Sequence, residues 1–275
     1  MNYPPGLRTA FASVVLLAVV LGVWQLATTP TRTSGLGDPE YRQLVASQKS
    51  GLPSPAEIAQ ASWHHLRSPF HDGGVNDKGI GIQLAFSLGR VLLGFLLAML
   101  IAVPVGFLVG SSPLLERALN PYVQVLKPIS PLAWMPLALY TIQDSSLSSI
   151  FVITICAVWP MLINTAHGVA SVKREWLNVA RTLEVRGLRR ALQVVLPAAA
   201  PTMVIGMRIS MGIAWLVIVA AEMLVGGTGI GTFVWNQWNN LSLANVIFAL
   251  LMIGVVGMLL DLAFGSLSRI VSYQE

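Results

Sequence analysis

The sequence predicts an all-α membrane protein with six transmembrane helices. Hydrophobic residues make up 55% of its 275 residues and charged residues only 11%, whereas a soluble domain carries about 25% charged residues. A membrane-spanning helix needs about 20 mostly apolar residues. Six segments satisfy this requirement: residues 9–27, 84–110, 122–142, 147–169, 201–225 and 242–265. Lipid is therefore the solvent that suits this composition.

The first segment, residues 9–27, is open to two interpretations. Arg8 precedes it and small residues follow it, as in a cleaved signal peptide. Its apolar run is long for a signal peptide, however, and the residues after Ala27 form no obvious cleavage site. The sequence favours a retained transmembrane helix and leaves the signal peptide as the alternative.

The segment that follows is predicted to be an external loop, because residues 28–80 mix Pro, Gly, Ser and charges of both signs. Within this loop, Ser54, Pro55 and Glu57 have the spacing of a helix N-terminus, with Ser as the N-cap and Glu at the third helical position. The apolar residues within 58–66 predict a short amphipathic helix that lies on the membrane surface.

The third span is expected to be strongly kinked, because prolines cluster over residues 128–136. Proline interrupts helical hydrogen bonding but is tolerated in membrane helices when neighbouring groups satisfy the freed carbonyls. The prolines within or at the ends of the predicted spans are Pro104, Pro128, Pro131, Pro136, Pro160 and Pro201. Kinked spans suit helices that move or line a cavity, and the alternative is that these prolines only shape packing.

Lysine and arginine orient the chain, because loops rich in these residues remain cytoplasmic. The loop between the fourth and fifth spans contains Lys173, Arg174, Arg181, Arg186, Arg189 and Arg190. The loops around Asp144 and over 226–241 contain neither lysine nor arginine and are predicted to face outward. The same rule places Arg8, Arg117 and Arg269 inside, and with them both termini. Because the basic residues gather in one loop, the net charge of +5 does not indicate a nucleic-acid partner.

These segments define the expected organisation. Residues 1–27 form a cytoplasmic end and the first span, 28–80 the external loop, 81–265 the transmembrane core with a cytoplasmic loop at 170–200, and 266–275 a cytoplasmic tail. No repeat of domain length is visible in the sequence. This weakens the case for a secondary transporter, because many such folds are built from paired halves.

The cytoplasmic loop is expected to be a helical hairpin. An apolar stripe at helical spacing consists of Trp176, Val179, Ala180 and Leu183. Gly187 offers a turn, and 188–195 predicts a second short helix that Pro197 ends. The hairpin is too polar for lipid, so we expect it to contact another protein. The alternative is a solvated loop that only fixes the topology.

This hairpin resembles the "EAA" loop of binding-protein-dependent ABC importer permeases, whose pattern is Glu-Ala-Ala, three residues, Gly, nine residues and Ile-x-Leu-Pro. Residues 178–180 take the place of the triplet, Glu184 that of the glycine, and Leu196-Pro197 the end of the pattern, without insertion or deletion. At position 184, a residue with a side chain must adopt the glycine conformation, or the turn must shift toward Gly187. The resemblance implies an ATPase-coupling surface made of Asn178, Val179, Ala180, Arg181, Thr182, Leu183, Glu184, Gly187, Leu196 and Pro197.

The resemblance extends from about Gly81 to the C-terminus. Residues 87–95, 128–136 and 221–231 are similar to the branch that imports nitrate, bicarbonate, sulfonates and taurine. Residues 133–140 and 234–243 are most similar to cyanobacterial nitrate/nitrite permeases, with bicarbonate permeases also close.

This resemblance implies the type I ABC importer permease fold in a bacterial inner membrane. It implies a second permease copy, two cytoplasmic subunits that hold ATP and Mg, and an external solute-binding protein that delivers a small anion. Nitrate or nitrite is the first expectation, and bicarbonate or sulfonate/taurine is the alternative. The chain itself is expected to bind no cofactor and to be no enzyme, because its sequence lacks the Gly-x-x-x-x-Gly-Lys-Ser/Thr phosphate loop.

Ionisable side chains within spans suggest function, because lipid makes them costly. They are Arg90, Lys127, Arg208, Glu222 and Asp261. Salt bridges, or side chains that reach toward water, are favoured for them over substrate contact. The candidates for a substrate path in the third to fifth spans are Lys127, Ser130, Trp134, Asn164, Arg208, Met211 and Trp215, and simple helix packing is the alternative for at least half of them.

Two other functional classes remain as alternatives. An ATP-independent transporter or channel needs no cytoplasmic docking hairpin. A membrane-embedded enzyme needs clustered catalytic side chains, and His167 stands alone near a cytoplasmic end. Metal binding is not indicated, since His64 and His65 have neither nearby cysteines nor a histidine partner four residues away.

Overall fold

The computed structural model describes residues 5–28, 52–74 and 77–271, and it folds them as helices with an isolated β-bridge between Asp72 and Lys78. The helices are α1 (Pro5–Thr28), α3 (Pro55–Arg67), α4 (Ile80–Ser111), α5 (Pro113–Leu126), α6 (Pro131–Ile142), α7 (Ser145–Ala170), α8 (Arg174–Thr182), α9 (Gly187–Arg190), the π-helical turn η1 (Ala191–Val195), α10 (Leu196–Val225), α11 (Ile230–Asn239) and α12 (Leu243–Val271).

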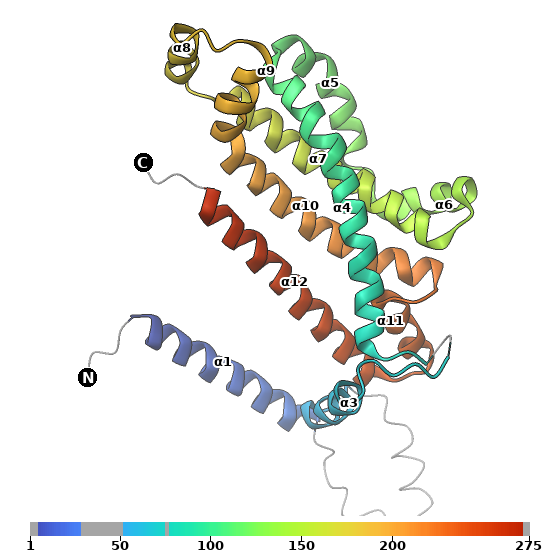
Figure 1. Ribbon diagram of the computed structural model, residues 1–275. Coiled ribbons are helices and arrows are strands. Elements are labelled where there is room, and N and C mark those ends of the chain that lie inside the picture. Colours follow the sequence, from blue (N-terminus) through green and yellow to red (C-terminus); the bar gives the residue numbers. More distant parts are fainter. Residues whose placement is uncertain (1–4, 29–51, 75–76, 272–275) are drawn as a thin grey trace, which may run out of the picture.

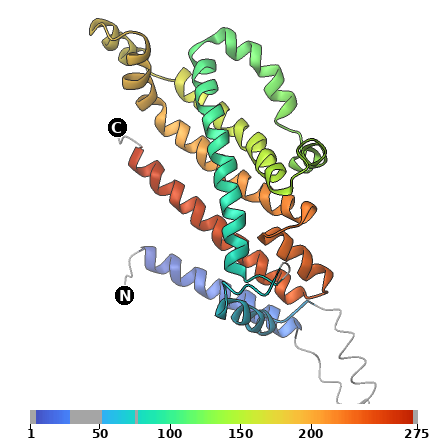
Figure 2. The same cartoon turned by 45° about the vertical axis from the view of Figure 1, so that its right-hand side comes forward.

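Four long helices, α4, α7, α10 and α12, form the bundle (Figures 1 and 2). The hairpin of α8 and α9 lies at one end of the bundle, and α3 and α11 lie at the opposite end. Within the described residues, five helical segments are long and apolar enough to cross a membrane: α1, α4, α7, the continuous helix that contains α10, and α12. They contain the predicted spans 9–27, 84–110, 147–169, 201–225 and 242–265, except that α12 begins one residue after the start of the last.

The kink predicted in the third span, 122–142, is a break between two helices. The chain leaves helical structure between Leu126, the last residue of α5, and Pro131, the first residue of α6. Pro128 and Pro131 lack amide protons. Pro131 also disfavours helical backbone at Ser130, which has ψ = 137°, whereas Lys127 before Pro128 keeps helical angles. At 12 residues, α6 is about 18 Å long, which is shorter than the bilayer core.

A stripe of small residues allows α4 and α7 to approach closely. The stripe recurs every four residues along α4 and consists of Gly94, Ala98, Ala102, Gly106 and Gly110. A β-carbon at Gly106 would lie 2.8 Å from the carbonyl oxygen of Leu162 on α7, and one at Gly94 would lie 2.6 Å from Ile153 Cγ2. Small-residue stripes replace the hydrophobic effect as the driving force for helix association in lipid, because they increase van der Waals contact.

Helix α10 packs between α7 and α12. Ser210 of α10 donates a hydrogen bond to the carbonyl oxygen of Ala157 on α7 at 2.7 Å, and Trp215 Nε1 donates to the carbonyl oxygen of Ile253 on α12 at 3.0 Å. The main apolar core contains buried side chains from α4, α6, α7, α10, α11 and α12. These contacts fix the relative positions of the bundle helices.

The short helix predicted in the external loop is confirmed as α3. Ser54 Oγ accepts a hydrogen bond from the Glu57 amide at 3.3 Å, and Glu57 Oε2 accepts one from the Ser54 amide at 3.1 Å, which together form a capping box. Helix α3 packs against α12, where His65 stacks on the ring of Phe248 with a centroid distance of 5.3 Å. Much of the predicted loop, residues 29–51 and 75–76, lies outside the described residues.

The prediction that Pro197 ends a short helix at 188–195 was also wrong. Residues 187–225 form one continuous helical segment, in which the π-helical turn η1 joins α9 to α10. Pro197 lies in the first turn of α10. The wider π turn directly before it changes the hydrogen-bonding register, so the missing proline amide does not terminate the helix. The hairpin is therefore connected to the long helix at the centre of the bundle without a break in helical structure.

Candidate functional site

The turn after α8 resolves how the hairpin accommodates Glu184. This residue has φ = 53°, in the left-handed region. The Val185 amide donates to the carbonyl oxygen of Ala180 at 2.9 Å, and the Glu184 amide donates to that of Arg181 at 3.0 Å. This pair of bonds is the Schellman C-cap, in which glycine usually occupies the left-handed position. Glu184 therefore adopts the glycine conformation, and Gly187 adds a second left-handed residue with φ = 58°.

The hairpin leaves an apolar surface exposed. Ala180 is buried, and α8 packs against η1. The rest of the predicted stripe points away from the chain, with Trp176 44%, Val179 59% and Leu183 69% exposed. Leu188 and Leu192 add further exposed apolar side chains, so that the exposed surface extends over both arms of the hairpin. We call the five exposed residues the hairpin apolar surface.

Polar and structural residues complete the predicted coupling set. Asn178, Arg181 and Thr182 are exposed on α8. Leu196 instead packs against the small apolar cluster of Val169, Ala199 and Met203, and Pro197 lies in the first turn of α10. Position therefore separates the set into residues on the hairpin and residues where the hairpin joins the bundle.

Three of the candidates for the substrate path lie together. Arg208, Met211 and Trp215 line a small cavity between α10 and α12, next to Asp261. Arg208 and Asp261 form an ion pair across these two helices, with Nη2 and Oδ2 2.5 Å apart. The salt bridge that the sequence favours for these charged residues is thus confirmed.

The other four candidates lie elsewhere. Lys127 and Ser130 are exposed in the break between α5 and α6, where Ser130 Oγ caps α6 by accepting from the Leu132 amide at 3.3 Å. Trp134 packs against the main core from α6. Asn164 donates to the carbonyl oxygen of Pro160 at 2.8 Å and lies where α7 crosses α10.

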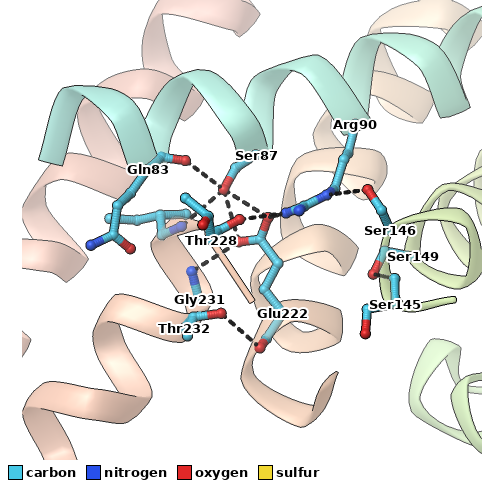
Figure 3. A network of polar contacts seen from close by, with 11 residues as sticks. Gln83, Ser87, Arg90, Ser145, Ser146, Ser149, Glu222, Thr228, Gly231 and Thr232 are labelled. Carbon is cyan, nitrogen blue, oxygen red and sulfur yellow. Dashed lines mark hydrogen bonds and ion pairs between the residues drawn. The ribbon is translucent and has the colours of Figure 1, made fainter. Parts of the chain in front are cut away.

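A second ion pair lies in a polar network at the opposite end of the bundle from the hairpin (Figure 3). Arg90 Nη1 on α4 lies 2.7 Å from Glu222 Oε1 on α10, and Ser87 Oγ lies 2.8 Å from the same oxygen. Arg90 also donates to Ser146 Oγ at 2.8 Å and to the carbonyl oxygen of Thr228 at 2.7 Å. The network joins α4, α7, α10 and the loop before α11.

Glycines close to Glu222 complete this network. The Gly231 amide donates to Glu222 Oε2 at 3.0 Å. A β-carbon at Gly229 would overlap the Glu222 carboxylate, and one at Gly231 would overlap the carbonyl oxygen of Val219. Sequence reasoning identified Arg90 and Glu222 as charged residues in spans, but it missed Ser87, which lies 135 residues before Glu222 in the chain. Only the packing of α4 on α10 brings these groups together.

Among the described residues, no three His, Cys, Asp or Glu side chains are grouped so that they could hold a metal ion. His167, considered above as an isolated catalytic candidate, is exposed at the C-terminal end of α7.

A bundle of apolar helices with internal ion pairs and a polar hairpin at one end defines the membrane-embedded subunit of a transporter. Residues 83–273 match the family described as "Binding-protein-dependent transport system inner membrane component", and the chain belongs to this family. It is 41% identical over 247 residues to "Nitrate import permease protein NrtB" of Synechocystis sp., a match that covers 90% of this chain and 84% of that protein. It is 42% identical over 224 residues to "Bicarbonate transport system permease protein CmpB" of Synechococcus elongatus, covering 80% and 81%.

The fold is that of a solved ABC importer. A chain of the MetNI methionine ABC transporter, in an inward-facing conformation, superimposes with a TM-score of 0.61 over 69% of this chain and 94% of its own length, at 16% sequence identity. The prediction of the type I ABC importer permease fold is thereby confirmed. The chain is a multi-pass inner-membrane protein and a permease subunit.

Proposed function

We propose that this chain is the permease subunit of an ATP-driven importer of a small inorganic anion, foremost nitrate. The hairpin apolar surface is the observation that supports coupling. Trp176 and Val179 of α8, with Leu183 directly after it, are 44% to 69% exposed on a segment that is otherwise rich in arginine. Apolar side chains grouped on a polar segment are typical of a protein contact. The occupant is a cytoplasmic ATP-binding subunit, which holds ATP and Mg itself.

The connection between the hairpin and the bundle suggests how movement is transmitted. The segment 187–225 is continuous, so a displacement of the hairpin carries α10 with it. Helix α10 packs against both α7 and α12. A second copy of the chain completes the path, and an external solute-binding protein delivers the anion at the end with α3 and α11. Both termini are then cytoplasmic, as the distribution of basic residues requires.

The names of the relatives support the choice of cargo. Relatives described as nitrate import permeases match 90% and 98% of this chain, whereas those described as bicarbonate permeases match 75% and 80%. We therefore infer nitrate as the cargo and keep bicarbonate as the second candidate. Both are planar oxyanions with one negative charge, so the same path suits either.

Substitutions in the hairpin apolar surface test the coupling. Val179→Asp and Leu183→Asp place a charge on exposed side chains, so the fold is expected to persist while docking of the ATPase subunit fails. ATP-driven nitrate uptake by the complete transporter in proteoliposomes should fall at least tenfold, and the ATPase subunits should no longer co-purify.

Gln193→Glu is the matched control, because it places a negative charge on an exposed side chain of the same hairpin outside the predicted coupling set, and the new carboxylate can still accept the hydrogen bond from Arg189. It should retain most of the uptake. Full uptake by the Val179 and Leu183 variants would refute coupling through this surface.

Uptake by the wild-type chain without ATPase subunits would favour an ATP-independent transporter. Uptake measured with bicarbonate or taurine in place of nitrate identifies the cargo.

A further inference from the structure

The ion pair between Arg208 and Asp261 has the geometry of a bidentate anion complex. Arg208 Nε donates to Asp261 Oδ1 at 2.6 Å, and Nη2 donates to Oδ2 at 2.5 Å. The two hydrogen bonds are parallel, and the planar guanidinium faces a planar group with two oxygens. A guanidinium binds carboxylates in this way because its N–H groups match the spacing of the two oxygens.

This ion pair lies near the middle of the bundle along its length. Ser210, two residues from Arg208, donates to the carbonyl oxygen of Ala157, which is at the middle of α7 (Ser145–Ala170). Both charged side chains remain partly accessible in the single chain, Arg208 to 45% and Asp261 to 54%. Charged groups at this depth are costly in lipid and typically face a water-filled cavity or another protein surface. We therefore expect water or another protein surface, and not lipid, to cover the face that presents this pair.

Glycines leave space around the pair. Gly257 and Gly265 lie one turn before and one turn after Asp261 on α12. A β-carbon at Gly257 would lie 3.2 Å from Trp215 Cδ1, and one at Gly265 would lie 3.8 Å from Arg208 Cζ. The cavity next to the pair has a volume of about 40 Å³. Since one water needs about 10–15 Å³ on this measure, the cavity has room for about three waters.

We propose that Arg208 is an exchangeable binding site for planar oxyanions, and that Asp261 is the resident carboxylate that the transported anion displaces. This inference rests on the proposed function and names the contact that recognises the cargo. Nitrate and bicarbonate present two coplanar oxygens to the guanidinium, as the Asp261 carboxylate does. A sulfonate or sulfate is tetrahedral and places further oxygens outside that plane, toward Trp215 and Met211.

Competition by Asp261 also explains how an anion leaves this site. An arginine that lacks a competing carboxylate and is partly shielded from bulk water would hold an anion more tightly, whereas transport requires binding that is weak enough for release. When nitrate occupies the guanidinium, the displaced carboxylate is a like charge nearby, and its return expels the anion. Asp261 is thus expected to set both the weak affinity and the fast exchange.

Anion binding to the complete transporter tests the proposal without requiring transport. Isothermal titration calorimetry with sodium nitrate, in the absence of the solute-binding protein, would compare the wild type with Asp261→Asn and Arg208→Lys. Asp261→Asn removes the competing charge with little change in shape, so nitrate affinity should rise at least tenfold while ATP-driven uptake falls. Arg208→Lys keeps the positive charge but removes the two parallel N–H donors of the guanidinium. The double variant Arg208→Lys with Asp261→Asn should therefore bind nitrate at least tenfold more weakly than Asp261→Asn alone.

Bicarbonate should compete with nitrate in the Asp261→Asn protein, and sulfate and taurine should not. The exchanged pair Arg208→Asp with Asp261→Arg retains an ion pair, and thermal unfolding shows whether it folds. A purely structural pair would leave nitrate affinity unchanged in Asp261→Asn, which would overturn the proposal. If the wild-type transporter takes up neither nitrate nor bicarbonate, the proposed cargo is refuted, whatever the effect of these substitutions on nitrate affinity.

Discussion

Arg90 of α4 and Glu222 of α10 lie 132 residues apart in the chain and form an ion pair with an N–O distance of 2.7 Å. The Glu222 side chain is only 1% exposed and that of Arg90 is 13% exposed. Hydrogen bonds from Ser87 and Gly231 satisfy the carboxylate further. This pair is enclosed and fully bonded, whereas the Arg208–Asp261 pair is half exposed next to a cavity. The contrast separates a pair that holds the bundle together from one that can exchange its partner.

Removing one partner of the enclosed pair should destabilise the protein strongly. Arg90→Ala leaves the buried Glu222 carboxylate without its positive partner, which typically costs about 3–5 kcal/mol. We expect a lower midpoint of thermal unfolding for the purified chain. The double variant Arg90→Ala with Glu222→Ala should lose less than the sum of the two single losses, because residues in contact are coupled. Strictly additive losses would show that the two side chains do not interact.

The contact between α4 and α7 predicts opposite effects for two glycines on one helix. A β-carbon at Gly106 would lie 2.8 Å from the Leu162 carbonyl oxygen, so Gly106→Ala should destabilise by about 1–3 kcal/mol through overpacking. Gly89 on the same helix has no atom within 4 Å of such a β-carbon, so Gly89→Ala should stabilise by about 0.5–1 kcal/mol. Thermal unfolding of both variants checks this, and equal effects would contradict the close approach.

The left-handed backbone at Glu184 predicts that glycine improves the turn. An L-residue in this conformation costs about 1–2 kcal/mol, which glycine avoids. Glu184→Gly should therefore slow amide hydrogen exchange at the end of α8 about fivefold, for a gain of about 1 kcal/mol. Arg186→Gly is the control, because Arg186 has φ = −120° and should only gain flexibility there. Faster exchange in Glu184→Gly would contradict the observed turn.

His65 predicts a pH-dependent attachment of α3. Burial lowers the pKa of His65 below its ordinary value, an effect that the hydrogen bond to Asn245 opposes and the nearby His64 reinforces. The folded protein therefore disfavours protonated His65, and the unfolded or detached state binds the proton first. The contribution of neutral His65 to the attachment of α3 is complete above the ordinary histidine pKa of about 6.5, and it decreases as the pH falls through that value.

Hydrogen exchange of α3 between pH 8 and pH 5, corrected for the intrinsic rate, should show this loss of protection. His65→Gln should remove most of the dependence, because glutamine does not ionise. His64→Gln should preserve most of it, since His64 is exposed. A dependence that persists in His65→Gln would assign the effect to another group.

Much of the fold was predictable from local sequence. The apolar runs of five spans identified helices that the structure contains, because the length and composition of a membrane helix are local properties. The capping box at Ser54 and the helix α8 were also predictable, since caps and helical spacing depend on residues within a few positions of each other. The prolines of the third span predicted a kink. They did not predict that the chain would leave helical structure between α5 and α6.

By itself, the sequence determined that this chain is a helical membrane protein with a polar hairpin, and its motifs determined the family. Only the tertiary structure decided which charges meet. Arg208 and Asp261 are 53 residues apart, and either could have paired with another group or faced water. It also decided that Glu184 adopts left-handed backbone and that Leu196 packs inward. The physical reason is that helix formation depends on near neighbours, whereas ion pairing and side-chain burial depend on how distant helices pack.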